Sequence, residues 1–134
     1  MKGNPTACVL VTALLVTGFL GACNASGERG EGSLTLLSYN VQNLFDGVHD
    51  GTEYSAFDPR DGGWDEDAAE AKAERVARVV REAVDGGPDV ICLQEVENAR
   101  VVSFLAEEAL SGLGYDYAAV TDAVGPAVQV AILS

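Results

Sequence analysis

The sequence predicts an α/β layered fold. Short apolar runs that suit buried strands alternate with longer stretches in which apolar residues recur every three or four positions. In chain order these segments are expected to be strand, helix, strand, helix, strand and strand, a pattern that indicates a sheet packed against helices. With 134 residues, of which 48% are hydrophobic and 22% charged, the chain has the size and composition of one globular domain.

The N-terminal segment is not expected to belong to that domain. Residues 1–22 combine a basic start with an uncharged apolar run, which is typical of a secretory signal peptide; the run is shorter than the about 20 residues that a spanning helix needs. The segment Leu20–Cys23 resembles a bacterial lipobox, so cleavage would leave Cys23 as a lipidated N-terminus. We expect an exported protein held at the bacterial cell envelope by this lipid, with secretion or a retained anchor as alternatives. Small polar residues over 23–33 predict a flexible linker.

The composition is strongly acidic, with 21 Asp and Glu residues, 8 Lys and Arg residues and a formal net charge of −13. Proteins that follow nucleic-acid backbones usually present a basic face, so this acidity weakens a nuclease interpretation. A bound metal ion can still reverse the local sign of a site. Cys92 stands in an apolar run and has no expected disulfide partner, so we expect it to be buried and unreactive.

The first predicted strand spans residues 34–40, without the clean alternation of a half-exposed strand. A long loop rich in Asp and Gly follows over residues 46–67. Its acids fail the spacing of an EF-hand calcium loop, whether counted from Asp46 or from Asp61. We expect instead a solvated acidic surface loop that contains the only histidine, His49, and is anchored by aromatic side chains. These are Phe45, Tyr54, Phe57 and Trp64.

The next segment is the clearest helix in the sequence. Asp65 or Asp67 is placed to cap its N-terminus, and Gly86, Gly87 and Pro88 end it. Its apolar stripe is Ala69, Ala73, Val76, Ala77, Val80, Ala83 and Val84. The opposite face mixes acids and bases, so we expect a solvated, salt-bridged surface rather than a nucleic-acid stripe. Its basic residues are Lys72, Arg75, Arg78 and Arg81.

Four further elements complete the predicted order. A short strand over residues 89–93 delivers polar residues at its C-terminal end. A second helix starts after Asn98, a residue type that favours the N-cap position. Extended segments are expected over residues 115–121 and 127–133, and the second of these is an apolar strand that would expose an edge.

Polar residues follow the first two predicted strands within two strings, Leu36–Asp46 and Pro88–Asn98. In the first string, the amide of Asn40 is able to donate to a phosphoryl oxygen while its carbonyl accepts from a neighbour. In the second, Glu95 follows an apolar run and offers the oxygen ligand that Mg²⁺ or Mn²⁺ prefers. The local alternatives are a turn-forming Asn and an exposed Glu.

Together the two strings resemble the opening half of the endonuclease/exonuclease/phosphatase superfamily of phosphoesterases. The resemblance implies that residues 34–134 form the N-terminal half of a layered two-sheet β-sandwich flanked by helices. It also implies Mg²⁺-dependent (or Mn²⁺-dependent) hydrolysis of phosphate esters, with Glu95 as the metal ligand and Asn40 as a catalytic residue of the metal and phosphate pocket. Three residues are expected at the rim of the site: Asn43, Gln94 and Asn98.

The resemblance also implies groups that the chain does not present in a matching motif. The superfamily uses a carboxylate–histidine pair and an Asp-x-Asn segment, which would lie downstream, so we expect the chain as given to be an inactive part of a longer, monomeric enzyme. Its substrate, whether nucleic acid, lipid or a small phosphate ester, is not fixed by the visible residues. The alternative is a non-catalytic surface lipoprotein that uses the scaffold as a binding module.

Overall fold

The computed structural model describes residues 33–134, so the predicted signal peptide, Cys23 and nearly all of the predicted linker lie outside the described residues. No helix among the described residues is both long enough and apolar enough to span a membrane. The elements are β1 (Leu36–Leu44), two short 3-10 turns (Ser55–Phe57 and Pro59–Asp61), α1 (Glu66–Ala83), β2 (Val90–Val96), α2 (Ala99–Phe104) with a π-helical extension (Leu105–Ala109), β3 (Ala118–Val120) and β4 (Gln129–Leu133). This is the predicted order of strands and helices.

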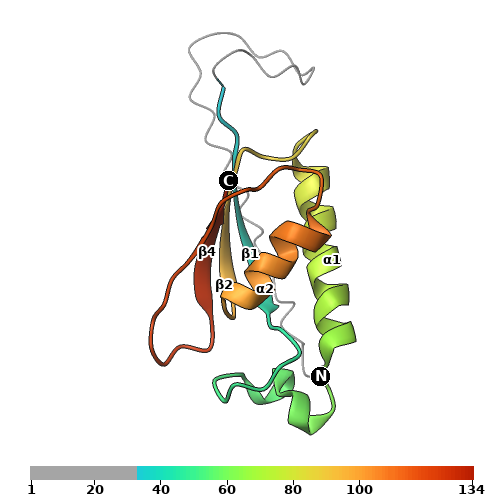
Figure 1. The fold of residues 1–134 in the computed structure, drawn as a ribbon, viewed down its shortest axis with the longest axis vertical. Helices are drawn as coiled ribbons and strands as arrows, with labels where there is room; N and C mark the ends of the chain where they lie inside the picture. The colour runs from blue at the N-terminus through green and yellow to red at the C-terminus, as the bar shows by residue number, and fades with distance from the viewer. Residues whose placement is uncertain (1–32) are drawn as a thin grey trace, which may run out of the picture.

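The four strands form one mixed sheet in the order β1-β2-β4-β3. Strands β1 and β2 are parallel, and β4 runs antiparallel to both β2 and β3. Parallel neighbours need a crossover connection, and α1 supplies it between β1 and β2. Figure 1 shows α1 and α2 on the same side of this sheet.

Helix α1 begins and ends where local chemistry places its boundaries. The side chain of Asp65 accepts a hydrogen bond from the backbone N–H of Ala68 at 2.9 Å, so Asp65 is the N-cap rather than Asp67. Gly86 and Gly87, just beyond the helix, have φ angles of 76° and 80°, which glycine adopts without strain. The buried stripe of α1 is Ala69, Ala73, Val76, Ala77 and Val80.

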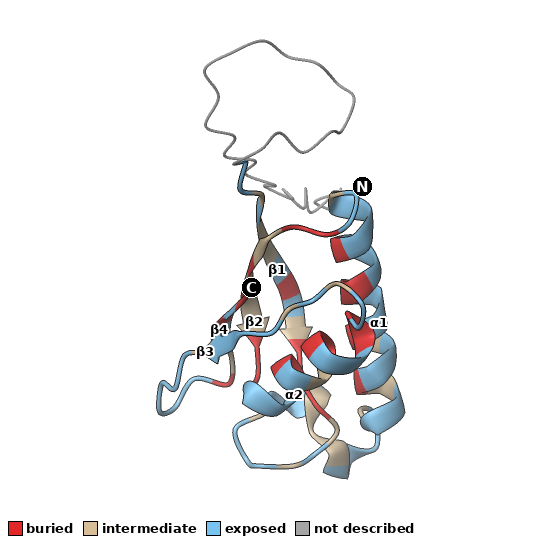
Figure 2. Cartoon of the chain, turned by 45° about the horizontal axis from the view of Figure 1, so that its top comes forward, coloured by how far each residue is buried: buried red, intermediate tan, exposed pale blue. Residues whose placement is uncertain are grey.

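Helix α2 begins at the predicted cap. Asn98 Oδ1 accepts a hydrogen bond from the backbone N–H of Val101 at 3.1 Å, and the helix then passes into the π-helical turn over Leu105–Ala109. In Figure 2 the buried stretches of α1 and α2 form bands along each helix, with exposed residues between them. Each helix therefore presents one apolar face to the sheet.

One apolar core joins the sheet to both helices. Its largest fully buried side chains from the sheet are Val41, Leu44, Ile91, Leu93, Val96 and Leu133. The alternate residues of the strands lie on the other face, where Leu36, Val130 and Ile132 are 36%, 45% and 47% exposed. Strand β4 lies between β2 and β3, so the expectation of an exposed edge is wrong: the apolar surface is a face of the sheet.

Three further sequence expectations need correction. Strand β1 begins at Leu36 and continues to Leu44, and β2 continues to Val96, because both strands resume pairing after an irregular step. Cys92 is half-buried rather than buried, because it pairs with Ile132 on the uncovered face. The acidic loop is partly ordered into the two 3-10 turns and ends at the cap of α1, two residues before the predicted boundary.

Candidate strand-end site

The parallel strands β1 and β2 are interrupted at the same level. Their register is regular up to the pair Asn40 and Gln94 and shifts before Leu44 pairs with Val96. Within this interruption three non-glycine residues have left-handed backbone conformations: Gln42 (φ 54°), Asn43 (φ 64°) and Glu95 (φ 64°). Such conformations are uncommon outside glycine and cluster at functional sites, where neighbouring structure holds them in place.

Asn40 and Glu95 contact each other across this interruption. Asn40 Nδ2 donates a hydrogen bond to Glu95 Oε1 at 2.7 Å, and Asn40 Oδ1 accepts one from the backbone N–H of Gln42 at 2.8 Å. Both polar atoms of the amide are therefore engaged, which fixes its orientation and that of the carboxylate. Within residues 33–134 no donor contacts Glu95 Oε2, and Asn40 is exposed while Glu95 is half-buried.

Lys72 brings a positive charge to the same place from α1. Its Nζ donates to the backbone carbonyl of Gln42 at 3.1 Å. Burial lowers the pKa of Lys72, Arg75 lowers it further, and the Glu95 carboxylate opposes both effects. The helix pattern assigned Lys72 to a solvated, salt-bridged face, whereas the ammonium reaches the interrupted end of β1. No sequence signal separated it from the other basic residues of α1.

The residues at this strand end fit a divalent metal ion. Mg²⁺ is usually bound through one or two carboxylates and keeps several waters. Glu95 supplies one carboxylate whose Oε2 has no donor among the described residues, and its partial exposure leaves room for water. Asn40 restricts the carboxylate to one orientation, and Lys72 supplies a cation for an anionic ligand.

The predicted rim residues separate in the structure. Asn43 lies in the interruption of β1, three positions after Asn40 in the sequence. The amide of Gln94 instead turns back along its strand and donates to Ser38 Oγ at 3.3 Å and to the carbonyl of Cys92 at 3.0 Å. Asn98 caps α2 and donates to Asp46 Oδ2 at 2.9 Å. Gln94 is the register partner of Asn40 and the chain neighbour of Glu95, whereas Asn98 belongs to the cluster around Asp46.

Asp46 is the centre of a second polar cluster, at the end of β1. Its Oδ2 contacts Asn98 Nδ2 and Arg100 Nε, both at 2.9 Å, and its Oδ1 accepts from the backbone N–H of Val48 at 2.8 Å. Its carbonyl accepts from Trp64 Nε1 at 2.9 Å, and its N–H donates to Glu97 Oε2 at 2.8 Å. All polar groups of Asp46 are thus paired within the protein, so it organises structure rather than holding a ligand.

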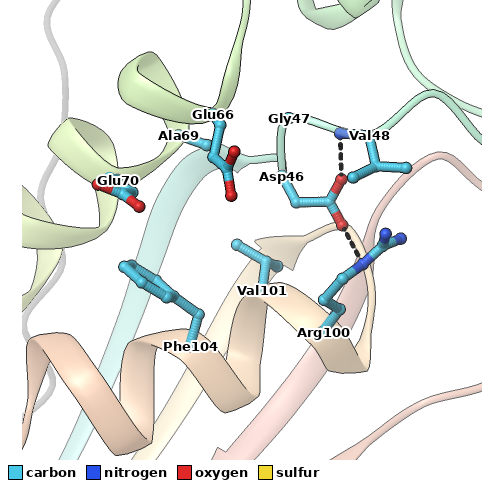
Figure 3. Close-up of a pocket in the computed structure, with 9 residues that line it drawn as sticks. All are labelled: Asp46, Gly47, Val48, Glu66, Ala69, Glu70, Arg100, Val101 and Phe104. Carbon is cyan, nitrogen blue, oxygen red and sulfur yellow. Dashed lines mark hydrogen bonds and ion pairs between the residues drawn. The ribbon is translucent and has the colours of Figure 1, made fainter.

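A small cavity of about 110 Å³ lies between α1 and α2 beside Asp46 (Figure 3). The ion pair of Asp46 with Arg100 lies along one side of it. Neither Asn40 nor Glu95 lines the cavity, so it is separate from the strand-end site, which is formed by Asn40, Glu95 and Lys72. Its lining residues are Asp46, Gly47, Val48, Glu66, Ala69, Glu70, Arg100, Val101 and Phe104.

The interrupted strands and α1 bring together a carboxylate, an amide and a lysine, groups that are suited to a metal ion and an anionic ligand. The chain belongs to the endonuclease/exonuclease/phosphatase family, whose model matches residues 35–133. Proteins of this family are in general hydrolases of phosphate esters, including nucleases, and generally depend on a divalent metal ion. No curated protein and no solved structure shows a significant match to the chain.

Proposed function

We propose that the protein is a Mg²⁺-dependent phosphoesterase, with Mn²⁺ as a substitute, in which Glu95 binds the metal and Asn40 contacts the phosphate. The observation that carries the proposal is the 2.7 Å hydrogen bond from Asn40 Nδ2 to Glu95 Oε1 across two interrupted strands. Bound there, the metal would polarise a phosphoryl oxygen and hold its negative charge. Nucleic acid, phospholipid and small phosphate esters remain the candidate substrates.

The described residues have distinct parts in this proposal. Asn40 holds the Glu95 carboxylate in one orientation, so the ligand is arranged before a metal arrives. The ammonium of Lys72, fixed on the carbonyl of Gln42, adds attraction for a phosphate. The single histidine, His49, contacts Glu53 and Asp58 in the loop, so among residues 33–134 no histidine lies beside Asn40 to move a proton.

The sheet has one face that neither helix covers, and this face bears on the fold of the whole domain. Its exposed apolar residues, among them Val130 and Ile132, are suited to pack against a second sheet, as in a two-sheet sandwich flanked by helices. We propose that residues 34–134 supply the first half of such a sandwich. Regions with exposed apolar faces of this kind are typical of interfaces.

The N-terminal assignments are likewise proposals. Residues 1–22 would be removed as a signal peptide, Cys23 would carry the lipid, and residues 23–33 would link the lipid to the domain. These steps would hold a monomeric enzyme at the outside of the bacterial cell membrane. Cys23→Ala tests them: the variant should remain uncleaved or leave the membrane fraction, and normal cleavage with unchanged fractionation would refute the assignment.

The strand-end site is tested with Glu95→Gln and Asn40→Ala, and with Glu107→Gln as a control on an exposed carboxylate of the same charge. Mn²⁺ binding should weaken by about tenfold or more in Glu95→Gln, because the charged ligand is lost. Any Mg²⁺-dependent hydrolysis of bis-nitrophenyl phosphate should fall about 10²-fold or more in both site variants. Unchanged Mn²⁺ binding by Glu95→Gln would contradict the proposal even where hydrolysis is too slow to measure.

A further inference from the structure

Three carboxylates converge on one point near the acidic loop. Asp50 and Glu53 belong to the loop, and Glu97 directly follows β2. One carboxylate oxygen from each residue lies within 4.8 Å of the other two. Oxygen ligands of a Ca²⁺ ion stand 2.3–2.6 Å from the metal, so oxygens that share one ion fall within such separations. The cluster includes neither Asn40 nor Glu95.

Glu97 is buried with one oxygen unpaired. The residue is only 4% exposed; its Oε2 accepts the Asp46 N–H, and its Oε1 has no hydrogen-bond partner among the described residues. A buried carboxylate without a full set of partners lowers the stability of the folded protein, and buried charges are usually paired or bound to a metal ion.

The side chain of Glu53 is also buried, and hydrogen bonds hold both of its oxygens in place. Its side chain is 1% exposed, and its two oxygens accept the backbone N–H groups of Asp50 and Gly51 at 2.5 and 2.8 Å. Burial alone would raise the pKa of Glu53, but these N–H groups bring it below its ordinary value. Asp50 is exposed, which gives an ion and its waters a route into the cluster.

The basic side chains among residues 33–134 do not neutralise this cluster. His49 Nδ1 lies 3.3 Å from both Glu53 Oε2 and Asp58 Oδ1, and it carries a charge only when protonated. Arg60 is engaged by Asp58, with an Nη2–Oδ2 distance of 2.7 Å, and this contact lowers the pKa of Asp58 to about 2. No ion pair of a lysine or arginine with Asp50, Glu53 or Glu97 occurs within residues 33–134.

We propose that Asp50, Glu53 and Glu97 bind a Ca²⁺ ion that ties the acidic loop to the end of β2. Ca²⁺ accepts six to eight oxygen ligands in adaptable geometry, and three carboxylates plus water meet that need. Mg²⁺ demands a strict octahedron and usually takes only one or two carboxylates, so it suits the strand-end site better. The ion has a structural part here, because Glu97 is joined to Asp46, whose contacts fix the start of the loop and the start of α2.

The test is Ca²⁺ binding by the purified chain carrying Glu95→Gln, so that the strand-end site does not take up the ion. Calorimetry gives the stoichiometry and affinity, and thermal unfolding followed through Trp64 gives the response of the loop. Trp64 is the only tryptophan, and its Nε1 donates to the Asp46 carbonyl. In this background we compare Asp50→Asn and Glu97→Gln with Asp61→Asn, an exposed acid of the same loop outside the cluster.

One Ca²⁺ ion should bind and raise the unfolding temperature of the parent and of Asp61→Asn. Asp50→Asn and Glu97→Gln should bind about tenfold more weakly or worse and should gain less from the same Ca²⁺ concentration. Absence of Ca²⁺ binding, or equal binding by all four proteins, would overturn the proposal. The outcome is independent of the strand-end assignment, since Glu95 is neutralised throughout.

Discussion

Glu97→Gln should make the metal-free protein more stable, and the gain should depend on pH. The pKa of Glu97 in the folded protein is raised by burial to about 7 from an ordinary 4.5. Between these values the unfolded chain has already lost its proton while the folded protein keeps it, so the free energy of unfolding falls as pH rises. At about 1.36 kcal/mol for each pKa unit, the full shift corresponds to about 3 kcal/mol.

Glutamine keeps an oxygen that can accept the Asp46 N–H now bonded to Glu97 Oε2, but it carries no charge. The variant and the parent should therefore be similar in stability near pH 4.5, and the variant should be more stable by up to about 3 kcal/mol at pH 8. Urea unfolding in EDTA, followed by Trp64 fluorescence, measures the difference, with Glu107→Gln as the exposed control. A difference that does not change between pH 4.5 and 8, or a less stable variant at pH 8, would show that the burial argument is wrong.

Three further substitutions, two of them with a matched control variant, test the packing and a helix cap, each by urea unfolding. Leu93→Ala, at a fully buried position, should cost about 2–5 kcal/mol, whereas Leu36→Ala on the uncovered face should cost far less; equal losses would contradict the one-sided core. Asn98→Ala removes the N-cap of α2 and should cost about 1–2 kcal/mol; no loss would mean that the cap contributes nothing. Gly47→Ala would place a Cβ 2.4 Å from the first backbone nitrogen of α1, while Gly63→Ala meets no atom within 4 Å. Only the first should destabilise, by about 1–3 kcal/mol.

The helices were predictable because their signals are local. Asp65 and Asn98 bond to N–H groups three residues ahead in the chain, and the stripe of α1 repeats with the period of one helix. The strand ends were less predictable. Glu95 and Asn43 take left-handed backbone conformations without being glycines, so the sequence gives no sign that β1 and β2 resume pairing beyond them.

The candidate sites show the same limit. The pairing of Asn40 with Glu95 was expected through family resemblance, whereas the approach of Lys72 was not, because helical periodicity does not say which carbonyl a long side chain reaches. The EF-hand spacing concerns only residues of one continuous loop. Glu97, the ligand that completes the cluster, is separated in sequence from the loop and comes close to it only in the folded protein. Spacing within the loop could not show this.

The contacts of Asp46 also constrain the order in which the protein folds. They join Asp46 to Glu97 and Asn98, which follow it by 51 and 52 positions in the sequence. The parallel pairing of β1 with β2 joins residues that are similarly far apart in the sequence. Such contacts carry a large loop-closure entropy that must be offset before they stabilise the chain. The backbone hydrogen bonds of α1 are local, so α1 is able to form early. The contacts of Asp46 with Glu97 and Asn98 form only after residues 97–98 have arrived, so the end of β1 should become fixed later than α1.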